Sequence, residues 1–287
     1  MRGRPVPVAP VRRLLSLAIA GFAALLAVGL VVGAQAAGVG LARLPYAVVV
    51  FGIQVLFVLA FTVAIRPPGM REVVVAGLVA AIAADVAAVV PLQASIAPLG
   101  YVAAGGFVAA VVAQLARRDG RIRATESLGS SLVIVVGVVA LASLVVLTRL
   151  PSGTQAISIA LTAAGVALVV ARLADTVAPW PRLAPQVPRG AVGVVLGPML
   201  GAVTAAILGS YVRGFTPLSA ALVGVVTALA AVLADLSVGY AQAGRRISGE
   251  LPTLWIARHL QGPLAGYALA APLLYAVSVV YFVPRYL

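Results

Sequence analysis

The chain has 287 residues, of which 63% are hydrophobic and only 9% are charged, and its formal net charge is +13. A mean hydropathy of +1.14 and repeated apolar runs of about twenty residues are typical of a polytopic membrane protein. No polar stretch reaches the roughly 50 residues of a small soluble domain, so a separate one is excluded. The absence of cysteine excludes disulfides, thiolate metal sites and thiol nucleophiles.

Nine apolar runs predict membrane-spanning helices, and we expect an all-α polytopic fold. The runs are residues 14–33, 45–65, 73–90, 98–115, 128–147, 156–170, 191–211, 218–238 and 263–283. A basic tail, residues 1–13, precedes the first run. Ala34-Gln35-Ala36 follows it and resembles a signal-peptidase site, so a cleaved signal peptide is the alternative. The run is longer than the usual apolar region of a signal peptide and fits a spanning helix better.

The arginines predict which side of the membrane each loop faces. All basic residues are arginines, and sixteen of them lie on the side of the tail against four on the other side. Because cytoplasmic loops are enriched in basic residues, we expect a cytoplasmic N-terminus and an external C-terminus, in the cell membrane (the inner membrane of a bacterium). Because membrane topology accounts for the excess of arginine, the positive net charge does not indicate a nucleic-acid partner.

The two longest polar segments, residues 172–190 and 239–262, then face the cytoplasm. Three carboxylates accompany them: Asp175, predicted just beyond the sixth helix, Asp235, predicted where the eighth helix ends, and Glu250. Hard oxygen ligands of this kind suit Mg²⁺, and nearby arginines suit phosphate. The alternative is that both aspartates cap helix ends or pair with arginines such as Arg172.

Two pieces, ADLSVGYAQAGRR and ARHLQGPLAGYALAAPLLY, resemble the C-terminal signature of the phosphatidate cytidylyltransferase (CDP-diacylglycerol synthase) family. The preceding segment LADTVAPWPRLAPQVPRGAVGVVLG is similar to that family's upstream stretch. The resemblance covers residues 171–287, a C-terminal three-helix part that follows a six-helix part at residues 14–170. It implies attack by the phosphate of phosphatidate on the α-phosphate of CTP, which gives CDP-diacylglycerol and pyrophosphate with the help of Mg²⁺.

The resemblance also implies roles for individual residues. Asp175 and Asp235 would be catalytic, and together with Glu250 they would bind the metal. Substrate would be bound by basic side chains: Arg189, Arg245, Arg246 and His259.

Departures from the family pattern indicate a divergent relative with a reduced site. A block of hydroxyl, lysine and carboxylate residues in the family is shortened to Val187-Pro188-Arg189-Gly190, and Asp235 lies about three residues too far from Arg245. No Asp or Glu follows Glu250, so the family's last acidic group is missing. Missing electrostatic groups of this kind cost about a hundredfold or more in rate, and loss of catalysis is therefore an open alternative.

Three classes of function remain: a nucleotidyltransferase acting on CTP and a phosphatidate-like lipid, a non-catalytic lipid-binding or scaffolding protein, and a small-solute transporter. The transporter rests on Asp85, a carboxylate inside the third predicted helix that must face the bundle interior or be protonated. Gly193, Gly197 and Gly201 repeat at every fourth residue and predict close helix packing rather than ligand contact. A homodimer is compatible with the sequence.

Overall fold

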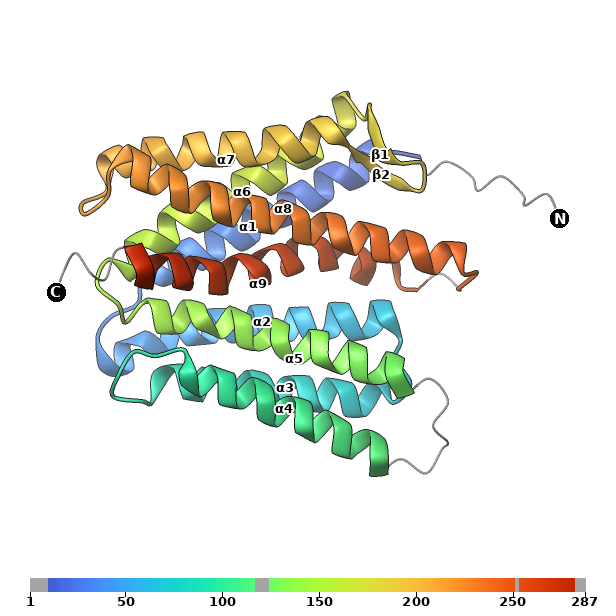
Figure 1. Cartoon of the computed structure of the whole chain (residues 1–287), viewed down its shortest axis with the longest axis horizontal. Helices are drawn as coiled ribbons and strands as arrows, with labels where there is room; N and C mark the ends of the chain where they lie inside the picture. The colour runs from blue at the N-terminus through green and yellow to red at the C-terminus, as the bar shows by residue number, and fades with distance from the viewer. Residues whose placement is uncertain (1–9, 117–123, 251–252, 282–287) are drawn as a thin grey trace.

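The computed structural model describes residues 10–116, 124–250 and 253–281, and it confirms an all-α polytopic membrane protein. Within those ranges nine helices are long and apolar enough to cross a membrane, and they run side by side in one bundle (Figure 1). They are α1 (Arg13–Gln35), α2 (Leu44–Ile65), α3 (Met70–Val89), α4 (Ala97–Ala116), α5 (Ala124–Leu147), α6 (Gly153–Val177), α7 (Ala191–Tyr211), α8 (Pro217–Ile247) and α9 (Trp255–Tyr281). A short 3₁₀ turn, η1 (Gly40–Arg43), precedes α2.

The two ends of the bundle differ in charge. α1 begins at one end and α9 finishes at the other, as an odd number of spans requires (Figure 1). Ten of the described arginines lie at the end where α1 begins, here called the arginine-rich end, and only Arg43, Arg149 and Arg213 lie at the opposite end. The remaining arginines that entered the topology prediction lie outside the described residues: Arg2, Arg4, Arg117, Arg118, Arg121, Arg123 and Arg285.

The helices pack in two groups. One group contains α1 and α6 to α9, the other contains α2 to α5, and α9 lies between them in contact with both α2 and α5. The first group therefore combines helices from both sides of the predicted boundary at residues 170 and 171. Tyr267 of α9 ties this group together, because its hydroxyl donates a hydrogen bond to the carbonyl of Ala23 in α1 at 2.8 Å.

The glycine repeat of α7 is a packing surface, as predicted. A Cβ atom on Gly193, Gly197 or Gly201 would stand 2.6 Å from a carbonyl oxygen of α6 in each case. The three carbonyls belong to Ala171, Ala167 and Ala163, which repeat with the same spacing. Small residues on both helices thus allow the backbones to approach closely where lipid provides no hydrophobic drive for association.

The predicted polar loop at residues 239–262 is wrong in extent. α8 does not end near Asp235 but continues to Ile247, and α9 begins at Trp255 rather than near Pro263. At about 1.5 Å per residue, the 31 residues of α8 span about 46 Å, more than the roughly 30 Å of a bilayer core. The helix stops where Gly249 adopts φ 77°, with the amide of Glu250 bonded to the carbonyl of Arg245 at 3.1 Å.

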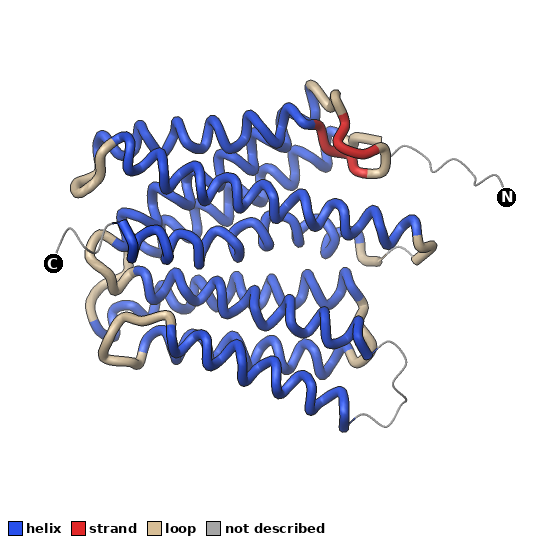
Figure 2. Tube along the Cα trace, viewed as in Figure 1, coloured by secondary structure: helices blue, strands red, loops and turns tan. Residues whose placement is uncertain are grey.

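The segment between α6 and α7 was expected to be a loop and contains a small β-hairpin instead. Strands β1 (Arg182–Ala184) and β2 (Val187–Gly190) pair antiparallel, with Arg182 opposite Gly190 (Figure 2). Strands of three and four residues are too short to produce a recognisable alternation of apolar and polar residues. Asp175 belongs to the last turns of α6, not to the segment beyond that helix.

Candidate functional site: an arginine-lined cavity

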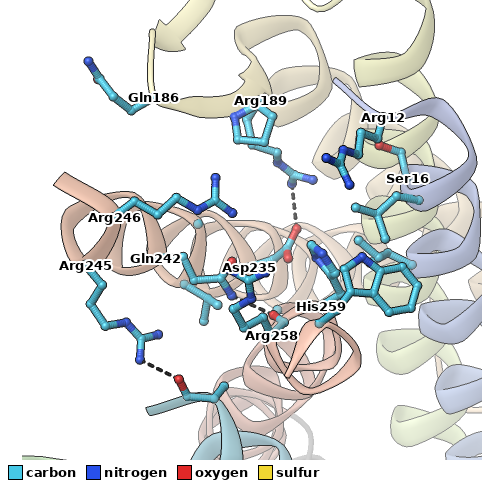
Figure 3. Close-up of a pocket in the computed structure, with 18 of the residues that line it drawn as sticks. Arg12, Ser16, Gln186, Arg189, Asp235, Gln242, Arg245, Arg246, Arg258 and His259 are labelled. Atoms are coloured by element: carbon cyan, nitrogen blue, oxygen red, sulfur yellow. Dashed lines mark hydrogen bonds and ion pairs between the residues drawn. The ribbon is translucent and has the colours of Figure 1, made fainter. Parts of the chain in front are cut away.

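A cavity of about 430 Å³ opens at the arginine-rich end, between α1, the hairpin, α8 and α9. Most side chains that the sequence assigned to a site line it together: Arg189, Asp235, Arg245, Arg246, Glu250 and His259. Asp175 is not among the lining residues and lies behind Arg189, with which it forms an ion pair. Figure 3 shows Arg12, Arg189 and Arg246 around Asp235, each from a different segment of the chain.

A network of buried charges forms the floor of the cavity. The guanidinium of Arg189 lies 3.1 Å from Asp175 Oδ2 and 2.7 Å from Asp235 Oδ2, and Arg172 forms an ion pair with the other oxygen of Asp235. The side chains of Asp175 and Asp235 are each 1% exposed and that of Arg189 is 3% exposed. Buried carboxylates need such partners, because an unpaired charge out of water costs several kcal/mol. The alternative that the aspartates pair with nearby arginines is confirmed for both, since Asp235 pairs with Arg172 and Arg189, and Asp175 pairs with Arg189.

Local structure directs these side chains to one point. The hairpin returns the chain toward α6, where the amide of Gly190 donates to Asp175 Oδ1 at 2.8 Å. Val187, two residues before Arg189, is fully buried and holds β2 against the bundle. Ala191 follows at once as the first residue of α7, and its amide bonds to the carbonyl of Pro181 at 2.9 Å. Arg189 is therefore placed by backbone and core contacts, not by its charge alone.

The other arginines of the wall have different partners. Arg245 lines the wall, but its guanidinium points toward α2, where it donates to the carbonyl of Ala64 in the last turn at 3.0 Å (Figure 3). In contrast, Arg12, Arg246 and Arg258 have no carboxylate within ion-pair distance in the described part of the chain. The Nε of Arg258 is buried and meets no hydrogen-bond acceptor among the described residues. A ligand with acceptor oxygens would satisfy these donors.

Trp255 and His259 line the cavity together with Arg12 and Leu15. Trp255, the first residue of α9, packs edge-on against His259 with ring centroids 5.5 Å apart. Trp180 lies apart from this pair, 68% exposed before the hairpin, with the guanidinium of Arg182 over its ring. Both tryptophans stand at the arginine-rich end, where interfacial aromatics commonly anchor a membrane protein.

A magnesium ion does not fit the carboxylates in this arrangement. Within the described ranges no three His, Cys, Asp or Glu side chains come together as a metal-binding group. The two aspartates that the resemblance assigns to the metal hold the guanidinium of Arg189 between them.

No family model, curated protein or solved structure matches this chain. The resemblance to the phosphatidate cytidylyltransferases therefore rests on the short motifs alone. What the structure adds is that residues from three separate segments, carrying that resemblance, meet at one cavity.

Sequence reasoning missed three residues of the site: Arg12, Gln242 and Arg258. Arg12 comes from the basic tail, which was read only as a topology signal. The amide of Gln242 donates to the carbonyl of Arg258 at 2.6 Å and to Gln261 Oε1 at 3.2 Å, which joins α8 to α9. The position of Gln242 in the same polar segment as Arg245 and Arg246 is the only sequence signal that pointed to it.

Asp85 belongs to the other packing group and takes no part in this site. It is half-buried and accepts a hydrogen bond from Gln54 Nε2 at 3.1 Å, while the same amide donates to the carbonyl of Val138 at 2.9 Å. Asp85 thus faces protein rather than lipid, as one of the two alternatives for a carboxylate inside a span predicted; the other was protonation.

Proposed function

We propose that this membrane protein binds the phosphate headgroup of a phosphatidate-like lipid in the arginine-lined cavity, on the cytoplasmic face of the cell membrane. The observation that carries the proposal is the excess of positive charge in one cavity. Its wall holds six arginines and only two carboxylates. Guanidinium groups are the preferred partners of phosphate oxygens because their planar forks donate two parallel hydrogen bonds.

The charge excess comes mainly from the rim and not from the floor. Arg172 and Arg189 are matched by Asp235 and Asp175 in the buried network, so they contribute little net charge. Arg12, Arg246 and Arg258 are the unmatched cations. A phosphate monoester, with close to two negative charges and several acceptor oxygens, would compensate them.

An apolar recess beside the cavity supports a lipid rather than a soluble ligand. This open recess of about 460 Å³ shares Arg12, Leu15 and Trp255 with the arginine-lined cavity, and the rest of its wall includes Leu14 and Ala18 of α1. Leu14 is 84% exposed in a helix that crosses the membrane. A lipid can therefore place its phosphate among the arginines and an acyl chain along α1.

Nucleotidyl transfer from CTP to phosphatidate is the second candidate function. It is favoured by the convergence of Asp235, Arg189, Arg246 and His259, which carry the family resemblance, on one cavity. A divergent enzyme of this kind would have to release Asp235 from its arginines before the carboxylate could take part in chemistry. We therefore rank non-catalytic lipid binding first.

The test is a binding titration that uses Trp255 as the reporter. The chain has two tryptophans, so a Trp180→Phe background leaves one, at the edge of the cavity. Protein in phosphatidylcholine nanodiscs is titrated with short-chain phosphatidate, short-chain phosphatidylcholine and glycerol 3-phosphate. We expect saturable binding of phosphatidate only. Equal binding of phosphatidylcholine would overturn the phosphate site, and equal binding of glycerol 3-phosphate would overturn the lipid assignment.

Substitutions of cavity arginines test whether the lipid binds in the cavity. Arg246→Gln and Arg258→Gln should each weaken phosphatidate binding about tenfold, since charged hydrogen bonds contribute about 1.5 to 3 kcal/mol and 1.4 kcal/mol is tenfold. Arg213→Gln, an exposed arginine at the opposite end, is the matched control and should bind like the parent. Pyrophosphate release from CTP and phosphatidate with Mg²⁺, lost in Asp235→Asn, would establish the second candidate.

A further inference from the structure

Two buried carboxylates and one guanidinium form an arrangement that lipid binding does not require. Asp175 and Asp235 come from α6 and α8, and both direct their Oδ2 atoms at Arg189. A pair of carboxylates buried together repel each other unless a cation lies between them. In many proteins that cation is a divalent metal held by carboxylate oxygens.

We infer that Arg189 is the resident cation of this site: its guanidinium bridges Asp175 and Asp235 in place of a divalent metal, so that the folded site needs no metal ion. Arg172 supplies a second positive charge on Asp235 Oδ1, which leaves the group of two aspartates and two arginines neutral. This inference concerns the floor of the cavity and does not depend on the ligand proposed for its rim.

The shape of the guanidinium suits this role. Its two terminal nitrogens reach different carboxylates, Nη1 toward Asp175 and Nη2 toward Asp235. A lysine ammonium is a single point charge on a flexible stem and lacks the planar fork. The backbone amide of Gly190 binds the remaining oxygen of Asp175, so the bridge also fixes the hairpin to α6.

Backbone lies close to one side of each carboxylate. A Cβ on Gly193 of α7 would stand 3.1 Å from Asp175 Oδ1, and Gly262 of α9 lies against Asp235 Oδ1. Asp175 thus lies behind the cavity wall, whereas Asp235 borders the cavity beside Arg172 and Arg189. A metal ion that bridged the two Oδ2 atoms would need the position that the guanidinium of Arg189 occupies.

The experiment compares the response to metal of the parent protein and of Arg189→Met. Thermal unfolding of purified protein is measured with EDTA and with millimolar Mg²⁺. The Tm of the parent should be the same in both. Arg189→Met leaves two unpaired buried carboxylates, so its Tm in EDTA should fall by about 5 °C or more and should rise again with Mg²⁺. Adding Asp235→Asn to this variant should abolish the response to Mg²⁺. An equal Mg²⁺ response in parent and Arg189→Met would overturn the inference.

A second measurement covers the case in which Arg189→Met does not fold. Mn²⁺ serves as a paramagnetic probe for oxygen-ligand sites, and its binding to the parent protein is followed by the loss of the free-ion EPR signal. We expect no saturable binding. Stoichiometric binding of Mn²⁺ that is lost in Asp235→Asn would show that the carboxylates hold a metal, and Arg189 would not be the resident cation.

Discussion

Gly262 of α9 lies directly against the carboxylate of Asp235 in α8: a Cβ at Gly262 would stand 1.9 Å from Asp235 Oδ1 and 3.1 Å from Arg172 Nη2. The absence of a side chain at one position thus makes room for the buried ion pairs of the cavity floor. The close packing of α9 on α8 at Gly262 therefore determines whether the ion pairs of Asp235 can form.

Gly262→Ala should destabilise the protein by about 1–3 kcal/mol, because the new methyl group displaces a carboxylate that two arginines hold. Thermal unfolding in detergent measures the change. Gly244→Ala in α8, where an added Cβ meets nothing within 4 Å, is the matched control and should leave Tm unchanged or raise it, since alanine favours helix. Equal Tm values for the two variants would contradict the close contact.

Gly197→Ala tests the contact between α7 and α6. The added Cβ would meet the carbonyl oxygen of Ala167 at 2.6 Å, and a backbone atom cannot swing aside as a side chain does. We expect a loss of about 1–3 kcal/mol of stability, measured by thermal unfolding. Gly129→Ala in α5, with no atom within 4 Å of the new Cβ, should behave like the parent.

Substitutions of the adjacent arginines Arg245 and Arg246 of α8 should have different effects, one on stability and the other on ligand binding. Arg245→Gln removes the hydrogen bond to Ala64 that links α8 to α2, and it should lower stability by about 0.5–1.5 kcal/mol with little effect on phosphatidate affinity. Arg246→Gln should weaken phosphatidate binding with little effect on stability, because Arg246 is exposed at the rim without a protein partner for its charge. Unfolding and tryptophan titrations on both variants check the prediction, and identical profiles would refute it.

Asp85 can be tested through its hydrogen bond to Gln54. Asp85→Asn retains an acceptor oxygen and should change stability little, whereas Asp85→Leu leaves the buried amide of Gln54 short of an acceptor and should cost about 1–3 kcal/mol. Thermal unfolding of the two variants distinguishes a hydrogen-bonding role from a requirement for charge. A large loss in Asp85→Asn would show that the ionised carboxylate itself matters and would revive the transporter hypothesis.

The sequence alone determined the class and the number of spans. Nine apolar runs predict nine helices because a bilayer admits only segments that satisfy their own backbone hydrogen bonds. The unequal distribution of arginines between the two sides predicted an odd number of spans. The spacing of Gly193, Gly197 and Gly201 predicted a packing surface. Each of these signals is local or periodic and needs no knowledge of which helix lies beside which.

Only the tertiary structure decided what the polar residues do. The extension of α8 beyond Asp235 was missed because a hydropathy reading ends a helix where polarity begins, although Gln242 and Arg246 continue it. The hairpin that delivers Arg189 was too short to predict. Whether Asp175 and Asp235 hold a metal or a guanidinium depends on side chains from α6, α8 and the hairpin meeting in one buried place. A buried charge takes the partner that the fold brings to it, and that partner is distant in the sequence.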